Sequence, residues 1–445
     1  MTRITFIVMA TLCVMSMGAA ECPDTTVTPL YTADQQQHEN LKRSQRIVFF
    51  NGDSASVAQD SVRALMDRFY IDQYRHFQDP EAPYFLLMSR DATLAMGIGG
   101  AVRMRGWYDF GGAVPYNGFI PYTIPTPPDP EKHRGLNATP AGTALFFRII
   151  GINKALGNFS AYIQASFNGG NDGRDFKIKK SYVTINDVTI GYASSTFVDI
   201  ASNPPVIDAQ GPCGITNKTS VLLQWRHYFK KRWSMAVSAE FPSSNIHTDG
   251  TTARELKDWF PDVAAYGQYE WAGGAGHVRL SGLLRVMPYR DVTASKNINR
   301  VGYGLQASGV VPFDYSWTVY FSAVGGRGIS SYLNDLSVTT VDLMPTPGRE
   351  SHMYAPWSYG LTAGIKYNFM PNLFASVSAS ECRLMARKGV DPDEYKYGLY
   401  GVANVIWNMS PRLQVGAEYL MGMRKNFNGI DGSAKRVNLL FQFSF

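Results

Sequence analysis

The sequence predicts an all-β protein, a transmembrane antiparallel β-barrel of about sixteen strands with a short N-terminal periplasmic helical segment. Three observations predict this fold class. Of the 445 residues 13% are aromatic, only 18% are charged, and 41 are glycine. No run of eighteen or more apolar residues follows the first twenty positions, so transmembrane helices are not expected. Apolar and polar residues instead alternate along most of the chain, which is typical of strands with lipid on one side and water on the other.

The N-terminus has the pattern of a secretory signal peptide. Arg3 gives a positive start, Ile4 to Met17 is apolar, and Gly18-Ala19-Ala20 supplies small residues for cleavage. We therefore expect residues 1–20 to be removed and the mature chain to begin near Glu21.

Residues 21–92 differ in pattern from the rest of the chain and are expected to form an N-terminal periplasmic segment. The sequence is polar and loop-like up to Asp53. Over residues 54–77 apolar and aromatic residues then recur at spacings of three and four, which predicts a helix with one apolar face. Such a helix either pairs with its copies in an oligomer or packs against the barrel.

Residues 93–445 have a period of two and are predicted to form the barrel. In the first strand, apolar residues occupy even positions from Leu94 to Tyr108, whereas Arg103, Arg105 and Asp109 occupy odd ones. The last strand repeats the alternation and ends on Phe445, as outer-membrane barrels typically do. Further strands are expected at residues 143–152, 158–168, 175–185, 188–196, 218–228, 232–241, 262–271, 276–287, 300–311, 315–325, 357–369, 372–384, 396–407 and 411–424.

The connections between these strands alternate between short and long. Two-residue turns are expected at residues 186–187, 313–314, 370–371 and 409–410, and long polar loops at 111–141, 197–217, 326–356 and 425–433. Outer-membrane barrels have short periplasmic turns and long external loops, and a propeller or sandwich would not alternate so regularly. We expect both termini in the periplasm and the barrel in the outer membrane of a Gram-negative bacterium.

Several segments, taken in order between Leu94 and Phe445, carry a family resemblance. They are Phe176-Lys177-Ile178-Lys179 with Tyr182, Gly191, Ser195-Thr196-Phe197 with Asp199 and Gly211-Pro212, Pro261-Asp262-Val263, Gly276 to Arg285, Gly328-Ile329 with Tyr332 and Asp335, and Val415 to Tyr419 with Arg436 and Phe445. Together these segments resemble the DcaP-like trimeric outer-membrane porins. The resemblance implies a homotrimer with outer-membrane lipid around it and small solutes passing through it.

The inward phase of the predicted strands is richer in cations than in anions. Pore-lining basic residues are expected to be Arg103, Arg105, Arg148, Lys177, Lys179, Arg226, Arg279, Arg285, Lys366, Arg412, Arg424 and Arg436. Glu240, Glu270 and Glu418 share that phase. A wall with one dominant sign concentrates counter-ions, and the planar guanidinium suits carboxylates, so we expect small anions to be favoured. The alternative is that these cations pair with neighbouring Glu, Asp and carbonyl groups and stiffen the barrel. Lys180 falls in the opposite phase to Lys177 and Lys179, which indicates a bulge or a subunit contact.

The loop at residues 197–217 is the candidate for a constriction loop folded into the pore. It has apolar residues that can pack and two acids, Asp199 and Asp208, which would face the basic wall and give a transverse field. The alternative is an external loop that caps a neighbouring subunit.

Other kinds of chemistry have little sequence support. Cys213 and Cys382 are expected to be unpaired thiols, and a disulfide between them is the alternative. The seven histidines form no metal-binding motif, no cofactor is expected, and the export signal argues against nucleic acid as a partner. A catalytic Ser220 and His227 pair on a strand is a weak enzyme hypothesis. We therefore predict a porin for passive diffusion of small hydrophilic solutes that prefers anions such as dicarboxylates. The competing hypothesis is a plugged or closed barrel that serves as a surface adhesin or structural anchor.

Overall fold

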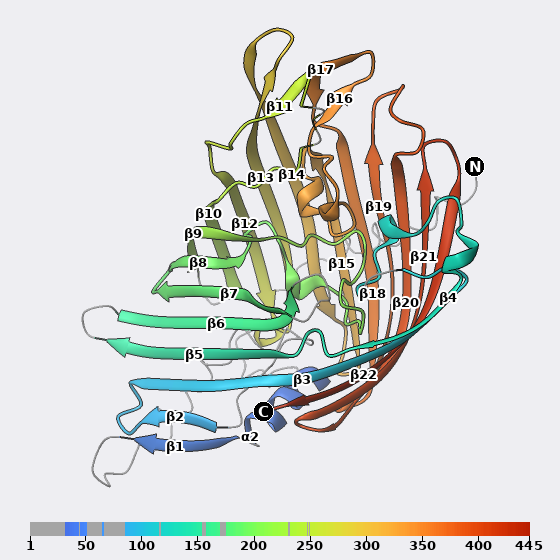
Figure 1. Cartoon of the computed structure of the whole chain (residues 1–445). Helices are drawn as coiled ribbons and strands as arrows, with labels where there is room; N and C mark the ends of the chain where they lie inside the picture. The colour runs from blue at the N-terminus through green and yellow to red at the C-terminus, as the bar shows by residue number, and fades with distance from the viewer. Residues whose placement is uncertain are drawn as a thin grey trace. The chain divides into compact units, whose positions relative to one another are not determined.

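A computed structural model describes residues 32–43, 45–50, 65, 85–114, 117–153, 157–169, 175–229, 232–246, 248 and 250–445. Within these residues sixteen antiparallel strands close into a barrel, each paired with the next barrel strand along the chain (Figure 1). The last strand pairs back with the first and completes the ring. The predicted signal peptide lies outside the described residues. No helix in the described part of the chain has the length and apolarity needed to span a membrane.

The barrel strands agree in number and order with the prediction. They are β3 (Leu94–Phe110), β5 (Ala144–Asn153), β6 (Gly157–Gly169), β7 (Asp175–Ile185), β8 (Val188–Ser194), β9 (Thr219–Phe229), β10 (Trp233–Glu240), β12 (Asp262–Trp271), β13 (Gly276–Asp291), β14 (Lys296–Pro312), β15 (Trp317–Arg327), β18 (Trp357–Met370), β19 (Leu373–Met385), β20 (Tyr395–Ser410), β21 (Leu413–Asn426) and β22 (Asp431–Ser444).

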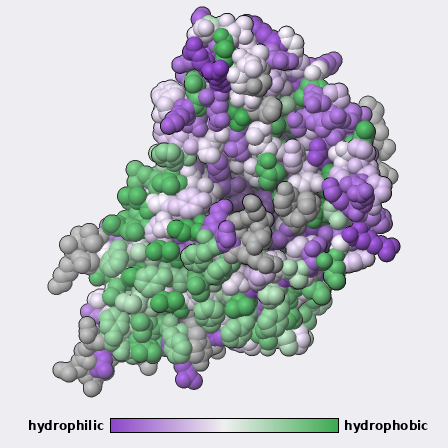
Figure 2. Space-filling view, viewed as in Figure 1, coloured by the Kyte–Doolittle hydropathy of each residue, from purple (hydrophilic) through white to green (hydrophobic). Residues whose placement is uncertain are grey.

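The predicted alternation matches the two faces of the wall. In β14 the outward residues Val301, Tyr303 and Leu305 are exposed, whereas the inward Gln306 and Ser308 are buried. A soluble protein has the reverse arrangement, with its apolar phase buried. In Figure 2 apolar side chains gather over the face occupied by β5 to β8, and hydrophilic residues lie over β11, β16 and β17. The outward phase of β14 is thus apolar and exposed, the pattern typical of transmembrane β-barrels.

The strand β3 joins the two ends of the barrel. Its first half, Leu94 to Ala101, pairs with β5, and its second half, Ala101 to Phe110, pairs with β22. Beyond the last β3 residue that pairs with β22, the short strand β2 (Phe85–Ser89) pairs with β3, and β1 (Arg46–Phe50) pairs with β2 in parallel.

The expectation of a loop-like sequence up to Asp53 is wrong in two places, because helix α2 (Ala33–Arg43) and strand β1 lie there. The helix lacks an apolar periodicity, which is why the spacing rule misses it. A capping box starts it: the Thr32 hydroxyl accepts from the Gln35 N–H and the Gln35 side chain accepts from the Thr32 N–H. Of the predicted helix at 54–77 only Leu65 is described. It is helical and packs with Leu86 and Met88, and the rest lies outside the described residues.

Strands β13 and β14 extend four residues further at their shared end than predicted, because they continue as a hairpin beyond the lipid-facing alternation. The connection between β21 and β22, expected as a long loop at 425–433, is likewise a short turn at 427–430. Small elements within the other long loops are β4 (Arg134–Thr139), β11 (Ala253–Glu255), β16 (Met344–Thr346), β17 (Arg349–Tyr354), η2 (Pro121–Thr123), η3 (Pro130–Lys132), η4 (Ile200–Ser202), η7 (Ser330–Tyr332) and η8 (Leu336–Val338), while η6 (Ala272–Gly274) lies in a short turn.

The main hydrophobic core of the described residues lies inside the barrel. Three segments supply much of it: inward loop 1 (residues 117–126), inward loop 2 (residues 197–217) and inward loop 3 (residues 328–343). Phe119, Phe197, Ile329 and Tyr332 are among its fully buried members. The lumen is therefore lined by packed loops as well as by the strands.

Candidate functional site

Inward loop 2 crosses the lumen and contacts the wall on several sides. It leaves β8, meets β13 and β14 through Asp199, reaches β20 and β21 through Asp208, and passes β18 at Gly214 before it enters β9. The segment expected as the constriction loop thus lies inside the barrel.

Asp199 fastens the start of this loop to the wall. One carboxylate oxygen accepts from the Ser308 hydroxyl at 2.7 Å and lies 2.8 Å from Nε2 of His277, and Arg279 lies 3.6 Å from the other oxygen. Burial pushes the pKa of Asp199 up, but Arg279, His277 and the two hydrogen bonds outweigh burial and hold that pKa below its ordinary value. The Asp199 carboxylate therefore holds the start of inward loop 2 against β13 and β14.

Asp208 fixes the middle of the loop. Its carboxylate accepts from the backbone N–H groups of Phe119 at 2.8 Å and Gly211 at 2.9 Å, which also ties inward loop 1 to inward loop 2. Burial raises the pKa of Asp208, against the effect of these hydrogen bonds. The inward-facing Glu418 in turn accepts from the N–H groups of Ile207 and Asp208. Both predicted loop acids are about 1% exposed, because protein groups surround their carboxylates.

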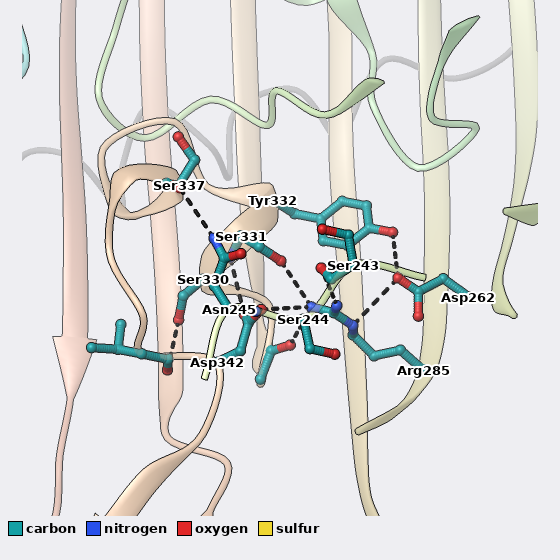
Figure 3. Close-up of polar contacts among 12 residues, drawn as sticks. Ser243, Ser244, Asn245, Asp262, Arg285, Ser330, Ser331, Tyr332, Ser337 and Asp342 are labelled. Atoms are coloured by element: carbon teal, nitrogen blue, oxygen red, sulfur yellow. Dashed lines mark hydrogen bonds and ion pairs between the residues drawn. The ribbon is translucent and has the colours of Figure 1, made fainter. Parts of the chain in front are cut away.

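Arg285 is buried among acids of two other segments (Figure 3). Its guanidinium lies 3.4 Å from Asp262 of β12 and 3.2 Å from Asp342 of inward loop 3, and it donates to Ser331 at 2.9 Å. The Tyr332 hydroxyl donates to Asp262 at 2.9 Å. This predicted pore-lining cation therefore holds inward loop 3 to the wall.

Arg436 is also fully buried. It forms a two-pronged ion pair with Asp109 of β3, at 2.6 Å and 3.1 Å, and donates to the carbonyls of Val114 and Asn117. Since β22 and β3 are the last and first barrel strands, this pair spans the seam of the barrel.

Two further predicted cations hold inward loops through backbone carbonyls. Arg279 donates to Val198 at 3.1 Å and stacks on Tyr266, 4.1 Å from the ring centre. Arg424 donates to the Tyr122 carbonyl of inward loop 1 and stacks on the same residue's ring. Arg279, Arg424, Arg285 and Arg436 therefore all contact carbonyl or carboxylate groups of the protein. These are the contacts expected under the alternative interpretation, in which inward cations stiffen the barrel.

Another group of predicted cations gathers on the wall formed by β3 and β5. Arg103 donates to Gln442 at 2.6 Å, Arg105 to Asn117 at 3.4 Å, and both guanidinium groups approach Gly142. Arg148 is inward and buried on β5. Asp208 and Glu418 lie within electrostatic range of Arg105, so this basic wall faces the middle of inward loop 2.

A β-bulge in β7 explains the phase of its three lysines. Gln164 is opposite Lys180 and Ala165 is opposite Ile178, so Lys179 is the extra residue. Lys177 is opposite the inward Ser166 and is exposed. Because of the bulge, Lys179 and Lys180 both line the lumen. The sequence interpretation of Lys180 as the mark of a bulge is correct.

A cavity of about 520 Å³ lies between inward loop 2 and the ends of the strands at the short-turn side. Among the described residues, its charged lining consists of four cations, Lys179, Lys180, Lys366 and Arg412, and two carboxylates, Asp34 and Asp208. Asp34 belongs to α2 and forms an ion pair with Lys366 of β18. Sequence reasoning missed α2 as part of the site, although its Thr32-x-x-Gln35 capping signal was legible. Arg226 of β9 is the remaining predicted cation. It lies near the turn after β7, where its backbone N–H donates to the Asp187 carbonyl at 2.7 Å.

The residues considered for other chemistry form neither a catalytic pair nor a disulfide. Ser220 and His227 are seven positions apart on β9, about 23 Å along a strand, so they form no catalytic pair. Cys213 and Cys382 are buried free thiols. Among the described residues no group of three or more His, Cys, Asp or Glu side chains is arranged to hold a metal ion.

Comparisons with known proteins support the fold assignment. No protein-family model and no curated protein matches the chain. Among solved structures, the outer membrane channel DcaP of Acinetobacter baumannii aligns with a TM-score of 0.68 and 20% identity, covering 80% of this chain and 98% of that one. An anion-selective porin from Comamonas acidovorans aligns at 0.51 with 10% identity, covering 79% and 100%. OmpT of Vibrio cholerae aligns at 0.51 with 10% identity, covering 79% and 98%. The chain has the fold of the outer-membrane porins of Gram-negative bacteria, and the resemblance to DcaP-like channels is confirmed at the level of the fold.

Proposed function

We propose that the protein is a porin that lets small hydrophilic solutes diffuse across the outer membrane, with a preference for anions such as dicarboxylates. The observation that carries this proposal is the lining of the 520 Å³ cavity, where cations outnumber carboxylates among the residues that the structure describes. One of the two carboxylates is paired with Lys366 and the other accepts backbone hydrogen bonds. A cationic lining in a confined space raises the local concentration of anions.

The zero-current potential in a planar bilayer under a potassium chloride gradient tests the preference. Arg279 and Arg285 hold inward loops, so replacing them would disturb the fold. The informative variant is instead Lys179→Gln, Lys180→Gln and Arg412→Gln together. The matched control neutralises three exposed cations of the external loops and their flanking strands, Lys257, Lys296 and Arg349.

We expect a chloride-biased potential in the wild type that falls in the cavity variant and persists in the control. A wild-type potential without bias, or an equal fall in both variants, would contradict the anion preference.

A second candidate function is a closed barrel that serves as an adhesin or anchor. The observation that favours it is the extent to which inward loops fill the lumen, while α2 lies at its rim. Single-channel recording of the wild type separates the two functions, because a porin conducts and a closed anchor does not. The homotrimer, which rests on the family resemblance, is also a proposal, and chemical cross-linking of the detergent-solubilised protein tests it.

A further inference from the structure

Lys366 occupies an unusual place in the barrel wall. Its side chain is inward and 5% exposed, with Nζ 5.3 Å from the centre of the Phe374 ring and 6.0 Å from that of Tyr320. Its register partners on the two adjacent strands, Thr318 and Ser376, are uncharged. Burial of an ammonium group is costly unless a counter-ion meets it, and these neighbouring strand positions supply none.

The counter-ion comes from α2. Asp34, in the first turn of this helix, forms the ion pair with Lys366. The Ala33 N–H donates to the Tyr315 carbonyl at 3.0 Å, and the Gln35 side chain donates to the Ala272 carbonyl at 2.9 Å. Both acceptors lie in short turns between barrel strands, so the start of α2 is held at the rim of the barrel while Asp34 points inward.

The Lys366 site opens onto the cavity described above. Asp34, Lys366, Tyr320 and Phe374 all contribute to its lining. Inward loop 2 covers the other side, where the Ser376 hydroxyl donates to the Pro205 carbonyl at 2.7 Å. A carboxylate that moves through this cavity would thus meet an ammonium group between two aromatic rings, a position that Asp34 already fills.

We propose that Lys366, Tyr320 and Phe374 form a carboxylate-binding site on the solute path, and that Asp34 is its internal ligand, which a solute carboxylate displaces. This inference rests on the proposed porin function and adds a specific site to it. Lys366 makes the ion pair, and the two rings supply an apolar wall that suits the carbon chain of a small organic acid. Asp34 and the solute compete for one ammonium group, so Asp34 sets the solute concentration at which the site fills.

Succinate is the probe, and the readout is the succinate concentration that halves the chloride current through single channels. If Asp34 occupies Lys366 nine-tenths of the time, its removal increases the apparent succinate affinity about tenfold. We therefore expect Asp34→Asn to lower the half-blocking concentration about tenfold, and Lys366→Gln to abolish the high-affinity block. The double variant should behave like Lys366→Gln alone, and Lys366→Arg, which keeps the charge, should retain the block.

Asp393→Asn, in the exposed loop between β19 and β20, is the matched control and should leave the block unchanged. A block insensitive to Lys366→Gln overturns the site. A block that depends on Lys366 but not on Asp34 overturns the role of Asp34. If the wild type does not conduct, calorimetric titration of the solubilised protein with succinate gives the same comparison among variants.

These results separate the site from the broader function. A chloride bias with a succinate response independent of Lys366 rejects the site and keeps the anion preference. A Lys366-dependent response without chloride bias rejects the preference and keeps the site.

Discussion

Replacing Asp335 with asparagine should remove a pH dependence from the stability of the barrel. Asp335 lies in inward loop 3 and is about 1% exposed. Its carboxylate accepts from the Tyr122 N–H at 2.9 Å and from the Tyr395 hydroxyl. Burial raises the pKa of Asp335 from 3.8 to about 6, because these hydrogen bonds and Arg424 compensate only partly for the lost hydration.

The sign of the effect follows from the higher pKa in the folded state. Between pH 3.8 and about 6 the folded protein keeps the Asp335 proton while the unfolded chain has lost it, so the folded state binds more protons. Stability should therefore fall as the pH rises through this window. The difference between the two pKa values corresponds to about 3 kcal/mol in the free energy of unfolding.

Urea unfolding in lipid vesicles, followed by tryptophan fluorescence at pH 4.5 and 7.5, measures this effect. The asparagine amide can accept from Tyr122 and donate to the Tyr395 oxygen, which itself donates to the Cys382 carbonyl at 3.0 Å. We expect Asp335→Asn to be more stable than the wild type at pH 7.5, by up to about 3 kcal/mol, and to have no such advantage at pH 4.5. Glu350→Gln, at an exposed position, is the control. Equal pH slopes for the wild type and Asp335→Asn would refute the reasoning.

Two further predictions concern the seam and the packing of inward loop 2. Arg436→Met leaves the Asp109 carboxylate buried without its partner and should cost about 3–5 kcal/mol of unfolding free energy, whereas Arg383→Met, which breaks a partly exposed pair with Glu381, should cost less than about 1 kcal/mol. Similar urea midpoints for both variants would contradict this. Gly360→Ala would place a methyl group 2.1 Å from the Gly214 carbonyl oxygen and should cost about 1–3 kcal/mol, while Gly267→Ala, with no atom within 4 Å, controls for the general effect of the substitution. An equal effect of the two alanine variants in the same unfolding assay would show that the contact with Gly214 is not tight.

The strands could be predicted because lipid imposes a period of two on every segment that crosses the membrane. The limits of β7, β12 and β18 illustrate this, since all three lie within one residue of the expected bounds. Beyond the lipid the outward phase no longer has to be apolar, so the extension of β13 and β14 had no such signal. The phase of Lys180 was informative for the same reason, because a bulge is the simplest way to break a period of two.

Some partners of the inward cations could not be predicted, because they lie in segments without a period of two. Alternation places Arg285 and Lys366 in the lumen but contains no information on where inward loop 3 or α2 lies relative to them. Asp109, the partner of Arg436, does lie on a strand whose alternation points it inward. Half of the question, which way a side chain points, is local in sequence. The other half, which group the side chain contacts, depends on residues that are 57 positions away for Arg285 and Asp342 and 332 positions away for Lys366 and Asp34.

The closure of the barrel at β3 and β22 has a consequence for the order in which the chain assembles. The Arg436 and Asp109 pair joins residues 327 positions apart, and Arg103 and Gln442 are separated by 339. Such contacts cannot form until almost the whole polypeptide has been synthesised, and closing so large a loop is entropically unfavourable and slow. Until then both edge strands have unpaired backbone groups that can pair with other chains. The ion pair between Arg436 and Asp109 therefore forms late in folding, when β22 pairs with β3 and closes the barrel. Before that step, the open barrel has to be kept from aggregating.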